Sequence, residues 1–542
     1  MNKIFLILSF LTSVAYSQKA QDIDALFEEY KDTPGAVVGV FKDGEIVFKK
    51  GYGIANMDYG IELSPTSVLD IASNGKQFTA AAITLLEIEG KLNFDDPIRK
   101  YLPDFPEYPG NPITINHLIH HTSGIRDYID LIDFSGQSWD NKFSKEEILE
   151  TIFRQPRLNF EPGGHYDYCN SGYLLLGRIV EQVSGQSFAN FIDQRLFKPL
   201  GMSNSLIYDN NNEIIPNRAI GYRKYKNGIE MDHDFNVSLS GDGQLLTNVI
   251  DFKKWDDNYT NNKLGDRTFL EKMFRKGVLN NGDTIGYAGG IFREEYQGFE
   301  TIEHSGSWAG FRSYYAKIPK KNLAVVVFSN FAEMNAIKKG RKILDILLNI
   351  PSEENSKDIR EPENQSDFNI SVKDLKKYAG MYWNDRFLFS QNIYISNDTL
   401  RQDKTENTLN PVSTGKFLLN NNKSKVFQFS KNNDSINQIY LKDGDWELEF
   451  EAFTPVEMPS DFKKFLGEYY SEALKSSISI KQENIKFILY KNGRNYGEIF
   501  PKKENEYYVN FFGTFSFDHH NNLELSTRRL KNVIFNHNQI KS

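Results

Sequence analysis

Cysteine is almost absent from this chain of 542 residues, since Cys169 is the only one. A single thiol excludes an intramolecular disulfide and any metal site built from several thiolates. Basic residues are also in deficit: 64 lysines and arginines stand against 72 aspartates and glutamates, for a formal net charge of -8. Because no basic face is available, we expect neither a nucleic-acid partner nor an anionic membrane surface as a partner.

Long apolar runs are missing as well. In MNKIFLILSFLTSVAYSQ, Lys3 precedes an apolar run from Ile4 to Val14, which is shorter than the ~20 residues of a membrane-spanning helix. The following AYS fits a small-x-small cleavage site, so residues 1–17 are predicted to be a secretory signal peptide. A buried N-terminal helix is the alternative. We therefore expect a secreted or periplasmic protein without a stable membrane anchor.

Two common hydrolase motifs, GxSxG and HExxH, do not occur, but SxxK does, at Ser73 and Lys76. Apolar residues recur at helical spacing from about Asn74 to Glu89, which predicts a buried helix ended by Gly90. Residues three apart share a helix face with Cβ atoms ~5–6 Å apart, so the amine can reach the hydroxyl. A desolvated lysine can then activate the serine as a nucleophile. The structural alternative is a serine N-cap with a snorkelling lysine.

The four-residue pattern alone is not specific. Ser413 with Lys416 and Ser460 with Lys463 also fit SxxK. Two further motifs narrow the interpretation. The first, Tyr168-Cys169-Asn170, precedes an apolar helix, and the second, His304-Ser305-Gly306, is predicted at the start of a strand pair.

In this order, SxxK, YxN and HxG resemble the serine β-lactamase and penicillin-binding protein superfamily. The class C β-lactamase branch, with its D-aminopeptidases, DD-peptidases and esterases, is the most similar. The resemblance extends over about Asp22 to Asn349 and includes ITINHLIHHTSG and GDGQLLTNVIDFKKW. It implies an acyl-enzyme mechanism without a cofactor.

The resemblance also implies a role for each motif residue. Ser73 would be the acylated nucleophile, Lys76 would share its proton network, and Tyr168 would act as base and then acid. Asn170 would bind the amide of the substrate, and His304 and Gly306 would line the wall of the pocket formed by the third motif. The backbone N–H groups of Ser73 and Ser307 would form the oxyanion hole. Whether Lys76 or Tyr168 takes the first proton is left open, because the two can titrate as a coupled unit.

Several other residues have structural explanations. Cys169 is expected to be a packing residue. The histidines His117, His120 and His121 lie in ITINHLIHHTSG, a segment that resembles the framework of the family, so a metal site is not expected there. Tyr166 competes with Tyr168 for the role of base, but only Tyr168 has an asparagine two residues later.

The order of sequence patterns predicts the fold. Ala36–Gly53 reads as a hairpin with a turn at Asp43-Gly44. A mainly helical middle follows, strands return over Tyr287–Asn330 with YAGGIF as the first, and a helix runs from Met334 to Leu348. We therefore predict an α/β (α+β) serine β-lactamase-like domain at 18–350, in which distant segments form one antiparallel sheet flanked by helices beside a mainly helical half.

The C-terminal third repeats itself. Residues 351–369 are polar and charged, which predicts a linker. DLKKYAGMYWN and DFKKFLGEYYS then match at a constant offset, and each leads into alternating strand text. We predict two antiparallel β-barrel-like domains, at 370–457 and 458–542, whose role the sequence does not indicate.

His304 replaces the lysine of the β-lactamase pattern. Histidine is mostly neutral at pH 7 and offers no fixed charge to a substrate carboxylate. We therefore predict a serine hydrolase whose small-molecule or peptide substrate is a small amide, a D-amino-acid peptide or an ester. A β-lactamase or DD-carboxypeptidase is the alternative enzyme, and a binding protein that kept the pocket is the alternative outside catalysis. The sequence does not indicate the oligomeric state.

Overall fold

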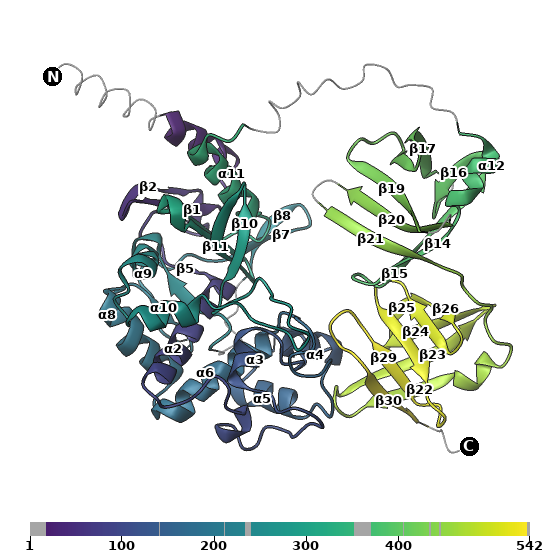
Figure 1. Ribbon diagram of the computed structural model, residues 1–542, viewed down its shortest axis with the longest axis horizontal. Helices are drawn as coiled ribbons and strands as arrows, with labels where there is room; N and C mark the ends of the chain where they lie inside the picture. The colour runs from purple at the N-terminus through teal and green to yellow at the C-terminus, as the bar shows by residue number, and fades with distance from the viewer. Residues whose placement is uncertain are drawn as a thin grey trace. The chain divides into compact units, whose positions relative to one another are not determined.

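The computed structural model describes residues 18–139, 141–210, 212–232, 240–351, 370–404, 406–432, 435–443 and 446–538. They form two compact units (Figure 1). The first unit contains Met1–Ile129 and Ser138–Ser356, and the second contains Asp130–Gln137 and Lys357–Ser542. The predicted signal peptide and nearly all of the predicted linker lie outside the described residues.

One antiparallel sheet organises the first unit, with the strand order β10-β11-β12-β13-β1-β2. The N-terminal strand β1 lies beside β13, in a register that runs from Ala36 opposite Ser329 to Lys42 opposite Leu323. The predicted hairpin of β1 and β2 and the assembly of distant segments are both observed. The strands are β1 (Ala36–Lys42), β2 (Glu45–Tyr52), β10 (Phe292–Tyr296), β11 (Phe299–Trp308), β12 (Phe311–Ile318) and β13 (Leu323–Ser329).

Helices cover both faces of this sheet. Val38 and Val40 of β1 pack in one apolar cluster with Ile343 of α11 (Ala336–Leu348). On the opposite face, the ring of Phe252 from α9 (Val249–Asn261) lies 5.2 Å from that of Phe328 on β13. Because both faces are buried, β1 and β13 are apolar at nearly every position instead of alternating.

Two predicted positions differ from the structure. Tyr287–Ile291 of YAGGIF form a loop, and the strand begins only at Phe292. Gly290 has φ of 73°, and a Cβ there would lie 2.5 Å from the backbone of Lys76, so this loop runs too close to another segment to pair as a strand. The HxG motif lies in the second half of β11, not at its start.

The remaining elements form the helical half of the first unit. The helices are α2 (Lys76–Ile88), α3 (Ile115–Ile119), α5 (Lys145–Phe153), α6 (Asn170–Ser184), α7 (Phe188–Ile192), α8 (Lys198–Leu200) and α10 (Arg267–Met273), and α4 (Tyr128–Ser135) passes from the first unit into the second. Small sheets are made by β3 (Ile54–Asn56) with β4 (Ile61–Glu62), β7 (Tyr222–Tyr225) with β8 (Gly228–Met231), and β5 (Leu69–Asp70) with β9 (Leu245–Thr247) and β6 (Leu206–Ile207).

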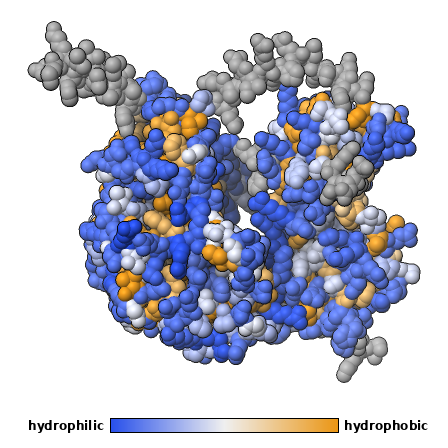
Figure 2. Space-filling model, viewed as in Figure 1, coloured by the Kyte–Doolittle hydropathy of each residue, from blue (hydrophilic) through white to orange (hydrophobic). Residues whose placement is uncertain are grey.

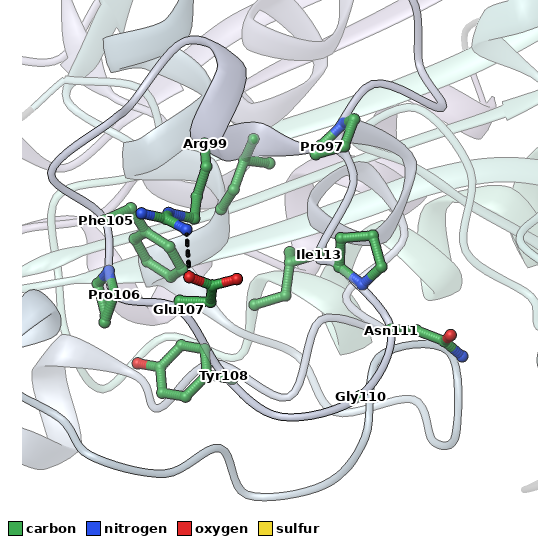
Figure 3. A pocket seen from close by; sticks show the side chains of 11 residues that line it. Pro97, Arg99, Phe105, Pro106, Glu107, Tyr108, Gly110, Asn111 and Ile113 are labelled. Atoms are coloured by element: carbon green, nitrogen blue, oxygen red, sulfur yellow. Dashed lines mark ion pairs between the residues drawn. The ribbon is translucent and has the colours of Figure 1, made fainter.

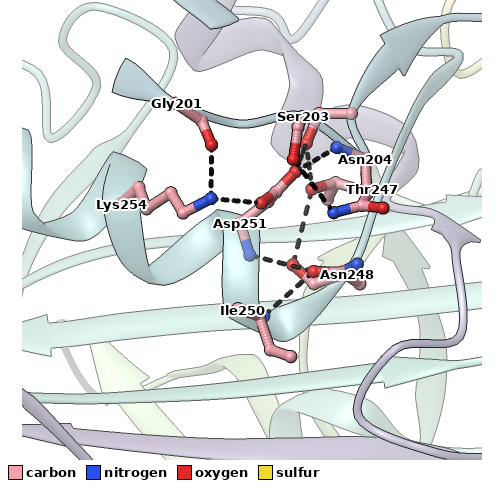
Figure 4. A network of polar contacts seen from close by, with 9 residues as sticks. Gly201, Ser203, Asn204, Thr247, Asn248, Ile250, Asp251 and Lys254 are labelled. Carbon is pink, nitrogen blue, oxygen red and sulfur yellow. Dashed lines mark hydrogen bonds and ion pairs between the residues drawn. The ribbon is translucent and has the colours of Figure 1, made fainter.

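A network of polar contacts around the buried carboxylate of Asp251 anchors β9, the partner of β5 (Figure 4). The carboxylate of Asp251 accepts the backbone N–H of Asn204 at 2.6 Å and pairs with Lys254 at 2.8 Å. The side chain of Asn248, directly after β9, caps α9 by accepting the N–H of Asp251 at 2.9 Å. These contacts fix β9 and with it β5, the strand that leads to Ser73.

The second unit contains two antiparallel barrel-like sheets. The first is a closed barrel of β14 to β21, and the second is a nine-stranded sheet with the order β25-β24-β23-β22-β30-β29-β28-β27-β26. The barrel strands are β14 (Gly380–Asn384), β15 (Phe389–Ser396), β16 (Thr399–Gln402), β17 (Thr408–Ser413), β18 (Lys416–Leu419), β19 (Lys425–Asn432), β20 (Ser435–Asp443) and β21 (Trp446–Phe453), preceded by α12 (Val372–Leu375). The sheet strands are β22 (Gly467–Ser471), β23 (Ser476–Glu483), β24 (Lys486–Lys491), β25 (Arg494–Glu498), β26 (Phe500–Lys503), β27 (Glu506–Val509), β28 (Gly513–Phe517), β29 (Leu523–Ser526) and β30 (Val533–Asn538).

The sequence repeat has a structural counterpart. In the first copy the Tyr382 hydroxyl donates to the carbonyl of Tyr378 at 3.0 Å. In the second copy the Tyr469 hydroxyl donates to the carbonyl of Phe465 at 2.7 Å. Each copy therefore begins with a 3-10 turn fastened to its first strand by a buried tyrosine. The fold class predicted from the sequence is confirmed, although only the first of the two barrel-like sheets is closed.

Figure 2 shows a mostly hydrophilic face on which apolar residues are scattered. Among the residues that the structure describes, no helix has the length and apolarity needed to cross a membrane.

Candidate active site

Ser73 lies in a strained turn between β5 and α2. The Asp70 carboxylate accepts the N–H of Ala72 at 2.6 Å, and Ala72 adopts a left-handed backbone with φ of 48°. A 3-10 turn, Ala72–Gly75, follows and places Ser73 before the first residue of α2. Ser73 is half-buried and does not cap the helix, because Gly75 occupies the N-cap position. The N-cap alternative is therefore wrong.

Lys76 is fully buried and does not snorkel to solvent. Its Nζ atom lies 3.0 Å from Ser73 Oγ, 2.9 Å from Asn170 Oδ1 and 2.5 Å from the carbonyl oxygen of Asp242. Three oxygen atoms from three segments thus surround the amine. The lysine and the serine that the SxxK spacing predicts to be neighbours are within hydrogen-bonding distance.

Two aspartates absent from the sequence prediction support this arrangement. Asp127 Oδ2 accepts both the backbone N–H of Asn170, at 2.6 Å, and its side-chain amide, at 2.9 Å. The amide is therefore oriented with its oxygen toward Lys76. The Asp242 carboxyl accepts the Tyr128 hydroxyl at 2.8 Å, and burial raises the pKa of that carboxyl. Asp127 lies shortly after the framework segment HHTSG, and Asp242 lies within GDGQ. Neither segment contains a pattern that gave a chemical reason to select its aspartate.

Tyr168 faces the lysine with its ring. Lys76 Nζ lies 5.0 Å from the centroid of the Tyr168 ring, which supports a cation–π contact. The imidazole of His121 packs against the same ring, with centroids 4.2 Å apart. Tyr166, the competing tyrosine, lies instead near Tyr287, with ring centroids 6.2 Å apart, and burial raises its pKa. The residue that carries the YxN pattern is thus the one beside Lys76.

His304 is buried and engaged at both ring nitrogens. Nδ1 donates to the carbonyl of Ser305 at 2.5 Å, so Nε2 is the acceptor for the Tyr287 hydroxyl at 3.2 Å. Burial, followed by the nearby charge of Lys76, lowers the pKa of His304 to about 3. The imidazole is therefore neutral at any physiological pH, and it offers no positive charge to a substrate.

Gly306 allows β11 to pass close to the turn that carries Ser73. A Cβ at this position would lie 2.2 Å from the carbonyl oxygen of Ile71 and 2.4 Å from Ser313 Oγ. Ser313 itself donates to Ile71 O at 2.6 Å and accepts from Asn74 at 2.7 Å, which ties β12 to the same turn. Ser307, the next motif residue, is exposed on β11.

The residues with structural explanations are largely used in packing. Cys169 is buried, and its thiol donates to the carbonyl of Ile125 at 3.2 Å. The backbone N–H of Cys169 donates to Nδ1 of His121 at 3.0 Å. His120 contacts the carbonyls of Asn116 and Arg275. No cluster of three or more metal-ligating side chains occurs in the described part of the chain.

The other two SxxK matches lack a buried amine. Ser413 and Lys416 lie at the ends of neighbouring strands of the closed barrel, and both are exposed. Ser460 and Lys463 lie at the 3-10 turn before β22 and are exposed as well. Activation of a serine requires a desolvated lysine, and neither of these two lysines is buried.

A cavity of about 300 Å³ lies in the first unit, where it is lined by the proline-rich segment 97–113 (Figure 3). Pro97, Phe105, Pro106, Tyr108 and Ile113 are among the residues that line it. An ion pair between Arg99 and Glu107, 2.9 Å long, crosses its edge. None of the residues predicted for catalysis or substrate binding lines this cavity.

Known proteins resemble both the sequence and the fold. The Beta-lactamase family matches residues 23–348. Penicillin-binding protein 4* of Bacillus subtilis (strain 168) is 30% identical over 336 residues, which is 58% of this chain and 72% of that protein. Protein flp of Staphylococcus aureus (strain MRSA252) is 31% identical over 323 residues, 57% of this chain, and the chain spans only 62% of its length.

Solved structures extend the comparison. An octameric penicillin-binding protein homologue from Pyrococcus abyssi superimposes with a TM-score of 0.57 at 26% identity, over 80% of this chain and 99% of that one. A D-amino acid amidase from Ochrobactrum anthropi SV3 shares the fold at 21% identity, with a TM-score of 0.51 over 62% of this chain and 99% of its own. Since the family match spans more than half of the sequence, this chain belongs to the beta-lactamase family, within the serine β-lactamase and penicillin-binding protein superfamily.

Proposed function

We propose that this protein is a secreted serine hydrolase that forms an acyl-enzyme on Ser73 and cleaves small amides, D-amino-acid peptides or esters. The observation that carries the proposal is the environment of the Lys76 amine. Two of the oxygen atoms that it contacts, Asn170 Oδ1 and the carbonyl of Asp242, can only accept hydrogen bonds. A neutral amine would direct its two N–H bonds at these acceptors and its lone pair at the Ser73 hydroxyl. This supports Lys76 as the group that receives the serine proton.

The proposed acylation step uses these contacts in order. Ser73 Oγ attacks the carbonyl carbon of the substrate while its proton passes to Lys76 Nζ. The developing oxyanion is stabilised by the backbone N–H groups of Ser73 and Ser307. The resulting ammonium can donate one N–H bond each to Ser73 Oγ, Asn170 Oδ1 and the carbonyl of Asp242, so protonation leaves no donor unused.

The second half of the cycle involves Tyr168. Collapse of the tetrahedral intermediate breaks the bond to the leaving group, which takes a proton from Lys76 or through the hydroxyl of Tyr168, whose ring lies beside Lys76. Water then attacks the acyl-enzyme, and the same pair accepts a proton from the water and returns one to Ser73 Oγ. Tyr168 as the first base, with Lys76 as the neighbouring cation, is the alternative assignment within this proposal.

The preference for uncharged substrates follows from His304. A buried neutral imidazole whose two nitrogens are engaged with Ser305 and Tyr287 provides no cation for a substrate carboxylate. A β-lactamase or DD-carboxypeptidase is the second candidate. The Bacillus subtilis relative that is 30% identical to this chain is named penicillin-binding protein 4*. Secretion rests on the predicted signal peptide at residues 1–17, and a mature chain that begins after Ser17 would support it.

A substrate screen tests the proposal. We would compare matched D- and L-aminoacyl anilides, p-nitrophenyl esters and a chromogenic cephalosporin, with a fluorophosphonate to label the nucleophile. We expect labelling of Ser73 and a higher kcat/KM for the neutral amides or esters than for the cephalosporin. Failure of the fluorophosphonate to label the folded protein would contradict the acyl-enzyme on Ser73.

A further inference from the structure

Helix α4 is shared by the two units. Its first two residues, Tyr128 and Ile129, belong to the first unit, whereas Asp130–Gln137 belong to the second. Leu131 and Phe134 are buried in the same apolar cluster as Phe515 and Phe535 of the nine-stranded sheet. A segment from the middle of the hydrolase sequence therefore completes the core of a sheet built by the last third of the chain.

Polar contacts within the second unit hold the end of α4. Lys491 of β24 donates to the carbonyl of Asp133 at 3.1 Å, and its Nζ lies 4.5 Å from the centroid of the Phe134 ring. Asn492 donates to the carbonyl of Ser135 at 3.0 Å. The last carbonyls of a helix have no partner within the helix. Here the sheet provides those partners, together with a cation at the negative end of the helix.

The beginning of α4 holds the shell around Lys76. Asp127 Oδ1 accepts the N–H of Ile129 at 2.9 Å and so caps the helix, while its Oδ2 orients Asn170. Tyr128, the first helical residue, donates its hydroxyl to the Asp242 carboxyl at 2.8 Å. Asn170 and Asp242, which both accept hydrogen bonds from Lys76, are therefore each held by one of the two residues at the start of this helix.

We propose that the nine-stranded sheet positions the Lys76 amine for acylation through α4, with Leu131 and Phe134 as positioning residues. A helix of eight residues is too short to be stable by itself and depends on the packing of its apolar side. If that packing is lost, Asp127 and Tyr128 lose their fixed places, and Asn170 and Asp242 no longer hold the amine against Ser73. The inference rests on the proposed acylation of Ser73.

The test compares two core phenylalanines of the second unit in the full-length protein. Phe134→Ala removes the α4 anchor, and Phe417→Ala removes another buried ring, from the closed barrel. We expect Phe134→Ala to slow fluorophosphonate labelling of Ser73 and to lower kcat for a p-nitrophenyl ester by about 10- to 100-fold, with little change in KM, since a small misplacement of a catalytic group costs rates of this order. Phe417→Ala should leave both rates within about twofold of wild type, because Phe417 belongs to an apolar cluster of the closed barrel that includes no residue of α4.

A conservative substitution and a milder one complete the design. Phe134→Leu keeps an apolar side chain in the core and should restore most of the rate. Lys491→Met keeps the apolar stem but removes the hydrogen bond to Asp133, and it should slow labelling about threefold or more even if Phe134→Ala fails to fold.

Two outcomes would overturn the inference. One is labelling at the wild-type rate in folded Phe134→Ala, or in Lys491→Met where the alanine variant does not fold. The other is an equal loss of rate in Phe417→Ala. Labelling of the wild type and none in Ser73→Ala establishes the underlying acylation independently, so failure of the inference is distinguishable from failure of the proposed function.

Discussion

The Tyr287 hydroxyl donates a hydrogen bond to Nε2 of His304, 3.2 Å away. Nδ1 of the same imidazole donates to the carbonyl of Ser305. The ring therefore carries one proton, on Nδ1, and Nε2 acts as an acceptor. A loop residue thus fixes the neutral form of the residue that replaces lysine in the HxG motif. This tautomer determines what charge the wall of the site can offer to a substrate.

His304→Lys should move substrate preference toward carboxylate-bearing molecules. An ammonium in a partly desolvated cleft attracts a carboxylate by a few kcal/mol at most, so we expect the ratio of kcat/KM for a cephalosporin to that for a neutral ester to rise about tenfold or more. His304→Gln, which stays neutral and polar, is the control and should leave the ratio nearly unchanged. A wild type that already prefers the cephalosporin by orders of magnitude would instead favour the β-lactamase alternative.

The same imidazole should make stability depend on pH. The pKa of His304 is lowered from 6.5 to about 3 in the folded protein, and that of His121, also buried, is lowered well below 6.5. The unfolded chain therefore binds protons that the folded chain does not, and stability falls as pH decreases from about 6.5 toward 3. For His304 alone the loss is about 2 kcal/mol at pH 5.

Denaturation by urea at pH 7.5 and pH 5 measures this effect. His304→Gln should lose about 2 kcal/mol less than wild type between the two pH values, because one of the groups that titrate on unfolding is gone. His165, which is exposed, gives the control. His165→Gln should show the same difference in the free energy of unfolding between the two pH values as wild type. An identical pH dependence in wild type and His304→Gln would show that the imidazole is not buried in its neutral form.

Much of the fold was predictable from the sequence because it follows from short-range patterns. The Asp43-Gly44 turn predicted the first hairpin. The repeated segments DLKKYAGMYWN and DFKKFLGEYYS, each followed by alternating apolar and polar residues, predicted the two barrel-like sheets. The loop Tyr287–Ile291 was not predictable, since its apolar sequence is typical of a strand. Only the close approach of Gly290 to the backbone of Lys76 explains its conformation, and that contact joins residues more than two hundred positions apart.

The candidate site divides along the same line. Ser73 and Lys76 are three residues apart, so helix geometry alone predicted their contact. Asp127 and Asp242 support Lys76 from distant segments, and no local pattern distinguishes them from the many exposed acidic residues of the chain. Their selection requires knowledge of which carboxylates are buried.

Ser73→Ala should abolish hydrolysis and fluorophosphonate labelling, because Ser73 is the serine held 3.0 Å from the buried amine of Lys76. The matched controls are Ser413→Ala and Ser460→Ala, which alter the other two SxxK matches beside exposed lysines. Both controls should label and turn over as wild type does. Mass spectrometry of the labelled peptide provides the measurement, and full labelling of Ser73→Ala would refute the assignment.

Ala72 should tolerate glycine but not a β-branched residue. Its φ of 48° lies in the left-handed region, which glycine adopts freely and valine strongly disfavours. We expect Ala72→Gly to change the free energy of unfolding by less than about 1 kcal/mol, because relief of strain offsets the added freedom of the unfolded chain. Ala72→Val should cost about 2 kcal/mol or more and reduce labelling of Ser73. Equal stability of the two variants would show that the turn before Ser73 is not strained.

Lys76→Ala and Tyr168→Phe should each lower the acylation rate by at least ~100-fold, the usual scale for removal of a positioned acid or base. Tyr168→Phe keeps the ring that packs on His121 and removes only the hydroxyl, so it separates proton transfer from packing. Single-turnover measurements with a p-nitrophenyl ester give the rate directly. In the double variant the losses should not add, because both groups serve one proton path. Additive losses would mean two independent functions, and near wild-type acylation by Tyr168→Phe would leave Lys76 as the base acting without the tyrosine.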